Sequence, residues 1–170
     1  MYNMDFVDPT MTTYTLLRQT WTVVSKIAET KLAKVGLTPE KAAVLWACRD
    51  YPGILTPAEI SRLVAREAQS IAGLLNRMEK EGLVKRVPKR KGRPYTEIRL
   101  TSRGEELCDP GIEVFKGLVQ GLTSDMSPEE REKFHDILNK LRLKVLDQLH
   151  IEPEDQVKGL PAEKPIMLKW

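Results

Sequence analysis

The feature that most constrains this fold is a pair of short amphipathic helices followed directly by two short strands, all within residues 56–100. Thr56 suits the N-cap of the first helix, Pro57 its first position, and Glu59 the acidic place of a capping box. A second helix is predicted over 69–81, because apolar residues recur there at the helical spacing i, i+3, i+4 and i+7. These residues are Ile71, Leu74, Leu75 and Met78.

The segment after the second helix has the pattern of a β-hairpin. Gly82 suits the end of the helix, and residues 83–87 and 95–100 alternate as two paired strands would. The candidate inward positions are Leu83, Val87, Ile98 and Leu100. The succession predicts a winged helix-turn-helix, so the fold class is mostly α with a small β-hairpin wing (α+β).

This stretch resembles the multiple antibiotic resistance regulator (MarR) family of bacterial transcription factors. The resemblance rests on residues 58–61 in the first helix, 74–86 running into the wing, and 98–104 after it, within a matching stretch of about 50 residues. The flanking helices agree only in length and order. Lys91 stands where the family usually has an acidic residue, two positions before the wing arginine, here Arg93. An ion pair within the wing is therefore not carried over.

The resemblance implies a DNA-binding transcriptional regulator that acts as a homodimer, in most cases a repressor. Its partner would be double-stranded DNA at a palindromic operator. The second helix would enter the major groove, and the wing would lie on or in the adjacent minor groove. The protein is accordingly expected not to be an enzyme and to use no cofactor.

The charge distribution agrees with DNA as a partner. The net charge is only +3, but residues 38–100 hold 13 Lys/Arg against 7 Asp/Glu, a balance of +6. Six of the nine residues in 85–93 are basic, a density that points to phosphate. An isolated basic run is more often a solvated face, but here it adjoins a helix-turn-helix pattern. The wing cations predicted to contact DNA are Lys89, Arg90, Lys91 and Arg93.

Polar residues near the start of the second helix matter most for base reading, because that end points into the groove. Gln69 is able to meet adenine N6 and N7 in a bidentate pair, and Gly73 permits close approach. For Arg77 an i, i+4 ion pair with Glu81 is an equally good alternative to DNA contact. The predicted reading residues are Gln69, Ser70, Gly73, Asn76 and Arg77. The residues expected at the DNA backbone are Thr56, Ser61 and Arg66.

Ahead of the two short helices, Thr38-Pro39-Glu40 starts another helix, which Tyr51-Pro52-Gly53 ends. Long helical segments flank this domain. Residues 10–35 form one, and a capping box at Ser127 starts another that runs to His150. Between them Ser102 and Glu105 form another capping box, and a helix is expected from there towards 123, kinked or broken near Cys108 by the Asp-Pro-Gly step that follows. The last helix carries an apolar stripe that no second layer of the chain covers. Its members are Phe134, Ile137, Leu138, Leu141, Val145 and Leu149.

These patterns predict a division of the chain into three parts. Residues 10–37 and 102–150 form a helical dimerisation region, 38–101 the winged DNA-binding domain, and 151–170 a C-terminal tail. Pairing of the first and last helices with those of a second subunit would bury their apolar faces. For the first helix, burial in a monomeric core is the alternative.

The resemblance also implies an effector pocket between the dimerisation helices and the DNA-binding domain, suited to an aromatic acid or a phenol. Trp21, Trp46 and Tyr51 are its candidate apolar walls, and Arg18 or Lys26 its anion partner. The alternative is that both tryptophans simply fill a core.

Other functional classes find little support in the sequence. Cys48 and Cys108 lie 60 residues apart, a spacing typical of buried thiols in a reducing compartment and not of a metal site. His135 and His150 have no paired nucleophile, so no catalytic site is predicted. No apolar run approaches the roughly 18 residues of a membrane span, and the N-terminus is acidic. A cytoplasmic protein without membrane association is expected.

A winged-helix protein-interaction module without operator-specific DNA binding is the alternative function, because a fold alone does not determine function. The basic wing favours DNA over this alternative. Loss of binding at high salt separates the two, since phosphate contacts release counterions.

Overall fold

The computed structural model describes residues 8–64, 66–87 and 96–148. It confirms the predicted fold class, because helices dominate and a two-stranded antiparallel hairpin forms the sheet. The elements in chain order are α1 (Pro9–Ala33), α2 (Pro39–Asp50), α3 (Pro57–Leu63), α4 (Ala68–Lys80), β1 (Val84–Val87), β2 (Glu97–Leu100), α5 (Ser102–Leu122) and α6 (Pro128–Gln148).

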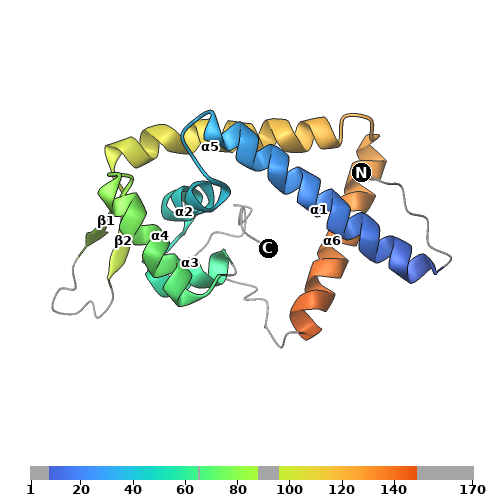
Figure 1. Ribbon diagram of the computed structural model, residues 1–170, viewed down its shortest axis with the longest axis horizontal. Coiled ribbons are helices and arrows are strands. Elements are labelled where there is room, and N and C mark those ends of the chain that lie inside the picture. Colours follow the sequence, from blue (N-terminus) through green and yellow to red (C-terminus); the bar gives the residue numbers. More distant parts are fainter. Residues whose placement is uncertain (1–7, 65, 88–95, 149–170) are drawn as a thin grey trace.

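Two regions are distinct in Figure 1. Helices α2, α3 and α4 gather with the hairpin at one end of the molecule, and we call these elements the winged lobe. Helix α5 leaves the hairpin and runs along the top to α6, while α1 and α6 occupy the other end. We call α1, α5 and α6 the flanking helices.

Side-chain caps set most helix starts, as the sequence predicts. The Thr38 and Thr56 hydroxyls accept hydrogen bonds from the third backbone N–H after them, at the starts of α2 and α3. At α6 the capping box is reciprocal: Glu130 N donates to Ser127 Oγ at 3.2 Å, and Ser127 N donates to Glu130 Oε2 at 2.8 Å. Each cap satisfies backbone donors that the helix itself leaves unbonded.

The cap of α5 lies one residue earlier than predicted. Thr101, and not Ser102, is the N-cap, and its hydroxyl accepts from Gly104 N at 3.1 Å. The same hydroxyl donates to the Gly82 carbonyl oxygen, at the end of α4. Contact with another element therefore selects Thr101 over its neighbour, which is a tertiary effect that local sequence rules do not include.

Of the kink or break predicted near Cys108, the break is wrong, because α5 runs without interruption from Ser102 to Leu122 with Pro110 inside it. Pro110 lies on the exposed side, where water can reach the carbonyl that its missing N–H leaves free. The adjacent Gly111 is buried, and a Cβ there would come within 2.9 Å of Leu37 Cδ1. This glycine thus permits close packing of α5 and does not end the helix.

One hydrophobic core holds the winged lobe together and extends into the flanking helices. Its main members are Leu32, Leu37, Val44, Leu45, Leu55, Ile60, Ile71, Leu75, Met78, Leu83, Val84, Ile98, Cys108 and Ile112. The Leu55 carbonyl accepts from Ile98 N at 2.8 Å, which places the chain before α3 alongside β2. The core fixes α4 relative to the hairpin, and so positions the candidate site.

The inward positions predicted for the hairpin are correct in part. Leu83 and Ile98 are buried, whereas Val87 and Leu100 are only half-buried. Val84, which strict alternation would turn outward, is 2% exposed. The strand begins only at Val84, because Leu83 N still bonds to the Met78 carbonyl as part of the turn after α4. Alternation therefore starts one residue later than the sequence pattern indicates.

Many large apolar residues of the terminal helices remain exposed within one chain, although Ala28 and Leu32 near the end of α1 are buried. In α6 no described residue is buried, and Ile137 is 62% exposed. The exposed large apolar residues of α1 and α6 are Met11, Tyr14, Leu16, Leu17, Trp21, Val23, Phe134, Ile137, Leu138, Leu141, Leu143 and Val145. Leu149, predicted as the last member of the α6 stripe, and His150 lie outside the described residues.

Candidate nucleic-acid interface

Helix α4 presents one face to the core and the opposite face to solvent. Its four apolar residues at helical spacing are all buried, as predicted. Because each residue advances about 100° around a helix, the face directly opposite holds Gln69, Gly73, Asn76 and Lys80. Gln69, Asn76 and Lys80 are exposed and Gly73 is half-buried. This outward face is the surface that a DNA groove would meet.

Lys80 belongs to the outward face but was not among the predicted site residues. The spacing i, i+4, i+7, i+11 from Gln69 is a signal in the sequence that finds it. Ser70 and Arg77, in contrast, lie on one flank of the helix and not at the centre of that face.

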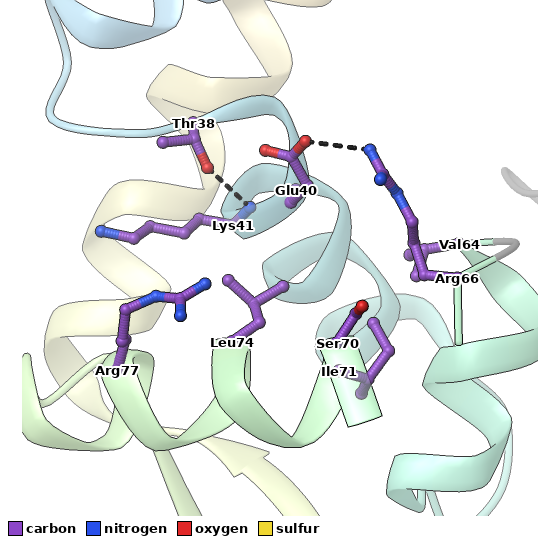
Figure 2. A pocket seen from close by; sticks show the side chains of 9 residues that line it. All are labelled: Thr38, Glu40, Lys41, Val64, Arg66, Ser70, Ile71, Leu74 and Arg77. Atoms are coloured by element: carbon purple, nitrogen blue, oxygen red, sulfur yellow. Dashed lines mark hydrogen bonds and ion pairs between the residues drawn. The ribbon is translucent and has the colours of Figure 1, made fainter. Parts of the chain in front are cut away.

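A groove of about 410 Å³ runs along this flank, between α2, the end of α3, and α4 (Figure 2). An apolar floor and charged walls line it: Thr38, Glu40, Lys41, Val64, Arg66, Ser70, Ile71, Leu74 and Arg77. Figure 2 shows the Arg77 side chain rising from α4 towards α2. Two predicted reading residues thus face this groove as well as the edge of the candidate interface.

Ion pairs tie the residues on either side of α4 to the first turn of α2. Lys41 Nζ lies 2.6 Å from Glu81 Oε2, and Arg66 Nη2 lies 3.3 Å from Glu40 Oε1. Glu81 is therefore engaged by Lys41, which contradicts the alternative that Arg77 pairs with Glu81. In the described part of the chain the Arg77 guanidinium has no hydrogen bond or ion pair, so its charge remains available to an anion.

On the other flank of α4, Arg86 joins the helix to the base of the wing. Its guanidinium pairs with the Glu79 carboxylate, and its backbone N donates to Glu79 Oε1 at 3.1 Å. Its Nη2 also donates to Asn76 Oδ1 at 2.6 Å. Arg86 lies opposite Ile98 in the strand register. The predicted wing cations Lys89, Arg90, Lys91 and Arg93 lie outside the described residues.

The residues predicted at the DNA backbone already make contacts within the chain. The Thr56 hydroxyl accepts from Glu59 N at 3.2 Å, as a cap. Ser61 donates through its hydroxyl to the Arg66 carbonyl oxygen, which holds the turn between α3 and α4. The Arg66 side chain is 58% exposed and pairs with Glu40. Ser61 therefore has a clear structural role, whereas Arg66 is the more accessible of the two to a phosphate.

Known proteins with similar sequences identify the family to which this chain belongs. The MarR family model matches residues 35–93, which include α2, α3, α4 and β1. The transcriptional regulator HosA of Escherichia coli O157:H7 is 31% identical over 105 residues, 62% of this chain and 77% of HosA. The chain belongs to the MarR family. MarR-family proteins are DNA-binding transcriptional regulators and not enzymes, which confirms the prediction that this protein is not an enzyme.

Solved structures of MarR-family regulators show the same fold. One is the Staphylococcus aureus MepR–DNA complex, with a TM-score of 0.69, 24% identity, and coverage of 76% of this chain and 95% of MepR. Another is the organohalide-sensing regulator RdhR bound to 2,4-dichlorophenol, with a TM-score of 0.75, 20% identity, and coverage of 98% of this chain and 96% of RdhR. At these identities the likeness establishes the fold.

The residues predicted for an effector pocket in this MarR-family protein are dispersed over the chain. Arg18, Trp21 and Lys26 lie on exposed parts of α1, with Trp21 69% exposed. Trp46 stacks on Phe115 of α5 with ring centroids 5.2 Å apart, and Tyr51 packs partly against the core. None of the five lines the groove in Figure 2. The alternative that the tryptophans fill a core therefore holds for Trp46, which packs against it, but not for Trp21.

Both cysteines are free thiols beneath the surface where α2 meets α5. Burial, with smaller contributions from Cys108 and Glu105, raises the pKa of Cys48 to about 12. Burial also raises the pKa of Cys108 to about 11, although the nearby Arg49 acts in the opposite direction. Thiols of this kind remain protonated and unreactive at neutral pH.

Two further observations concern residues 8–64, 66–87 and 96–148. No group of three or more His, Cys, Asp or Glu side chains there is arranged to hold a metal ion. None of the helices combines the length and apolar character that crossing a bilayer requires.

Proposed function

We propose that this MarR-family protein is a homodimeric, sequence-specific regulator that binds a palindromic operator and acts as a repressor. The observation that carries the proposal is the outward face of α4. This face holds Gln69, Asn76 and Lys80 exposed on a helix that the core fixes beside a basic hairpin. In this proposal α4 enters the major groove, and the wing cations neutralise phosphates at the adjacent minor groove.

The homodimer is supported by the apolar faces that one chain leaves uncovered. We assign residues 10–37 and 102–150 to dimerisation, 38–101 to DNA binding and 151–170 to a tail. Pairing of α1 and α6 with a second copy would remove their exposed leucines, isoleucine and tryptophan from water. The two α4 helices would then meet half-sites about 10 to 10.5 base pairs apart. Light scattering of the purified chain tests this assembly directly.

Operator selection from a random duplex library tests the function. The purified chain should enrich a palindrome, and its affinity should fall steeply with salt. Replacing Lys89 by Ala should weaken all sequences about equally and reduce the log–log salt slope by about one. Replacing Gln69 by Ala should instead relax sequence preference, costing about 1 to 3 kcal/mol on the best site. Enrichment of no sequence would favour a protein-interaction module.

An aromatic acid or phenol is the effector class that we propose, in a pocket completed by the second subunit near Trp21, Trp46, Tyr51, Arg18 and Lys26. The support is the similar fold of RdhR, whose structure holds 2,4-dichlorophenol. A hundredfold loss of operator affinity requires about 2.7 kcal/mol of coupling between the two sites. Titration with aromatic carboxylates and phenols, read by tryptophan fluorescence and operator binding together, tests it. No change in either signal would exclude this class.

A further inference from the structure

The amide of Asn76 is held in one orientation by Arg86. A guanidinium carries only donors, so the amide atom that faces Arg86 Nη2 at 2.6 Å must be the oxygen. The carbonyl oxygen of Asn76 is therefore directed towards the wing side of α4.

Arg86 is itself held firmly enough to impose this orientation. Glu79, one turn after Asn76 on α4, pairs with the Arg86 guanidinium through one oxygen and with the Arg86 backbone N through the other. The Arg86 side chain is 31% exposed and that of Glu79 39% exposed, so solvent screens the pair only in part. The Glu79 carboxylate, the Arg86 guanidinium and the Asn76 amide thus form a hydrogen-bonded network between α4 and β1.

The part of Asn76 left for a ligand is its amino group. Asn76 is exposed on the outward face of α4, near Gln69 and Lys80. Asparagine normally pairs with adenine by donating to N7 and accepting from the N6 amino group. Here the second lone pair of the oxygen is still open, but its use would bring the adenine amino group beside the positive guanidinium of Arg86. Guanine presents two acceptors, N7 and O6, at the same edge, and the guanidinium attracts them.

We infer that Asn76 reads guanine through its amide N–H groups, and that Arg86 is the positioning residue that sets this preference over adenine. The inference deepens the DNA reading proposed above and rests on it. It also separates two residues of one face, because Gln69 has no such partner among the described residues and keeps its oxygen for adenine.

Operator selection with the full chain and its variants tests the inference. The position that Asn76 reads is the one whose preference disappears in Asn76→Ala. There the wild-type protein should prefer guanine over adenine by about 10-fold, within the range that side-chain contacts to base edges provide. Arg86→Met frees the amide to turn, so the guanine-to-adenine ratio should fall towards one. Arg99→Met removes a cation from the paired strand without touching Asn76, and should leave the ratio unchanged.

A second variant keeps the test decisive if Arg86→Met impairs folding. Asn76→Asp retains the acceptor towards Arg86 but has no donor, so the preferred base should change from guanine to cytosine, whose N4 amino group donates. Circular dichroism and thermal melting confirm that each variant is folded.

The outcomes separate this inference from the proposed function. Adenine at the Asn76 position of the wild-type operator, or an unchanged ratio in Arg86→Met, would overturn the role of Arg86 while leaving operator binding intact. An equal loss on all sequences in Asn76→Ala would show a phosphate contact and overturn base reading by Asn76. If the wild-type protein enriches no sequence, the proposed function fails and this inference fails with it.

Discussion

Helices α4 and α6 carry apolar residues at the same spacing, yet only α4 buries them within the chain. In α4, Ile71 is 1% and Met78 0% exposed, whereas in α6, Ile137 is 62% and Leu141 42% exposed. The difference lies in what surrounds each helix. The winged lobe provides a core on one side of α4, while α6 extends from the far end of α5 (Figure 1).

The same apolar spacing therefore occurs in a helix that packs on its own chain and in a helix that does not. Apolar spacing identifies the face that leaves water, but it does not identify the partner. For α4 the partner is the same chain, and the opposite face stays exposed, as the proposed contact with DNA requires. For α6 the uncovered stripe is larger than the scattered apolar residues that monomeric proteins usually expose. The two regions can therefore be separated by experiments on stability and on assembly.

The largest effect is expected where α5 meets the winged lobe, because Gly104 at the start of α5 touches Leu83. A Cβ on Gly104 would lie 2.1 Å from the Leu83 carbonyl oxygen, so backbone would have to move. Gly104→Ala should lower the free energy of unfolding by about 3 kcal/mol or more, measured by urea denaturation. Gly117→Ala in the same helix meets nothing within 4 Å and should be neutral or stabilising by up to about 1 kcal/mol. Equal effects at both glycines would contradict the packing at Leu83.

A second prediction addresses the uncovered stripe of α6. Ile137→Glu places a charge where the proposed dimer excludes water, so the dissociation constant of the dimer should rise about 100-fold, or about 2.7 kcal/mol. Sedimentation or light scattering over a concentration series measures it. Asn139→Glu adds the same side chain on the opposite side of the helix and should leave assembly unchanged. A protein that is monomeric before substitution would remove the proposed contrast between the two regions.

Local signals predicted most of the fold, because caps and turns act over a few residues. Thr38, Thr56, Ser127 and Gly82 mark helix ends in sequence and in structure alike, and Gly82 adopts φ +69°. Long-range contacts decided the rest. The hydroxyl of Thr101 bonds to the Gly82 carbonyl, a contact that no local rule contains.

In the candidate site, too, local spacing predicted some features, and long-range contacts determined the others. Helical spacing was sufficient to place Gln69 and Asn76 on the outward face of α4. The partner of Glu81 was not predictable, because Lys41 is 40 residues away and comes near only when α2 packs beside α4. The bond between Arg86 and Asn76 likewise depends on how β1 lies against the helix.

A smaller effect is expected from the ion pair between α2 and α4. Lys41 has a side chain only 16% exposed, while that of Glu81 is 41% exposed, so solvent screens the interaction partly. Lys41→Met should lower the free energy of unfolding by about 1 kcal/mol. Lys116→Met breaks an exposed pair with Glu113 in α5 and should change it by no more than a few tenths. Restoration by Lys41→Glu combined with Glu81→Lys would show that pairing, and not side-chain bulk, is responsible.

The smallest effect concerns the thiols where the winged lobe meets α5. Burial raises the pKa of Cys48 to about 12 and that of Cys108 to about 11, from 9.0 for an unburied thiol. Because the folded pKa values are the higher ones, the stabilisation is complete below pH 9 and declines as pH rises towards 12. At pH 9 half of the unfolded thiols are ionised, so each thiol should cost the folded state about 0.4 kcal/mol relative to pH 7.

Comparison with Cys48→Ala and Cys108→Ala isolates this term, because every other titrating group is common to the variants. The pH-dependent loss between pH 7 and pH 9 should shrink by about 0.4 kcal/mol with each substitution, whatever the substitution does to stability at pH 7. A disulfide-exchange reagent at pH 8 should label both thiols far more slowly in the folded protein than in urea. Labelling at the unfolded rate would mean that water enters between α2 and α5. The winged lobe and the flanking helices would then move apart in solution, although they share one core here.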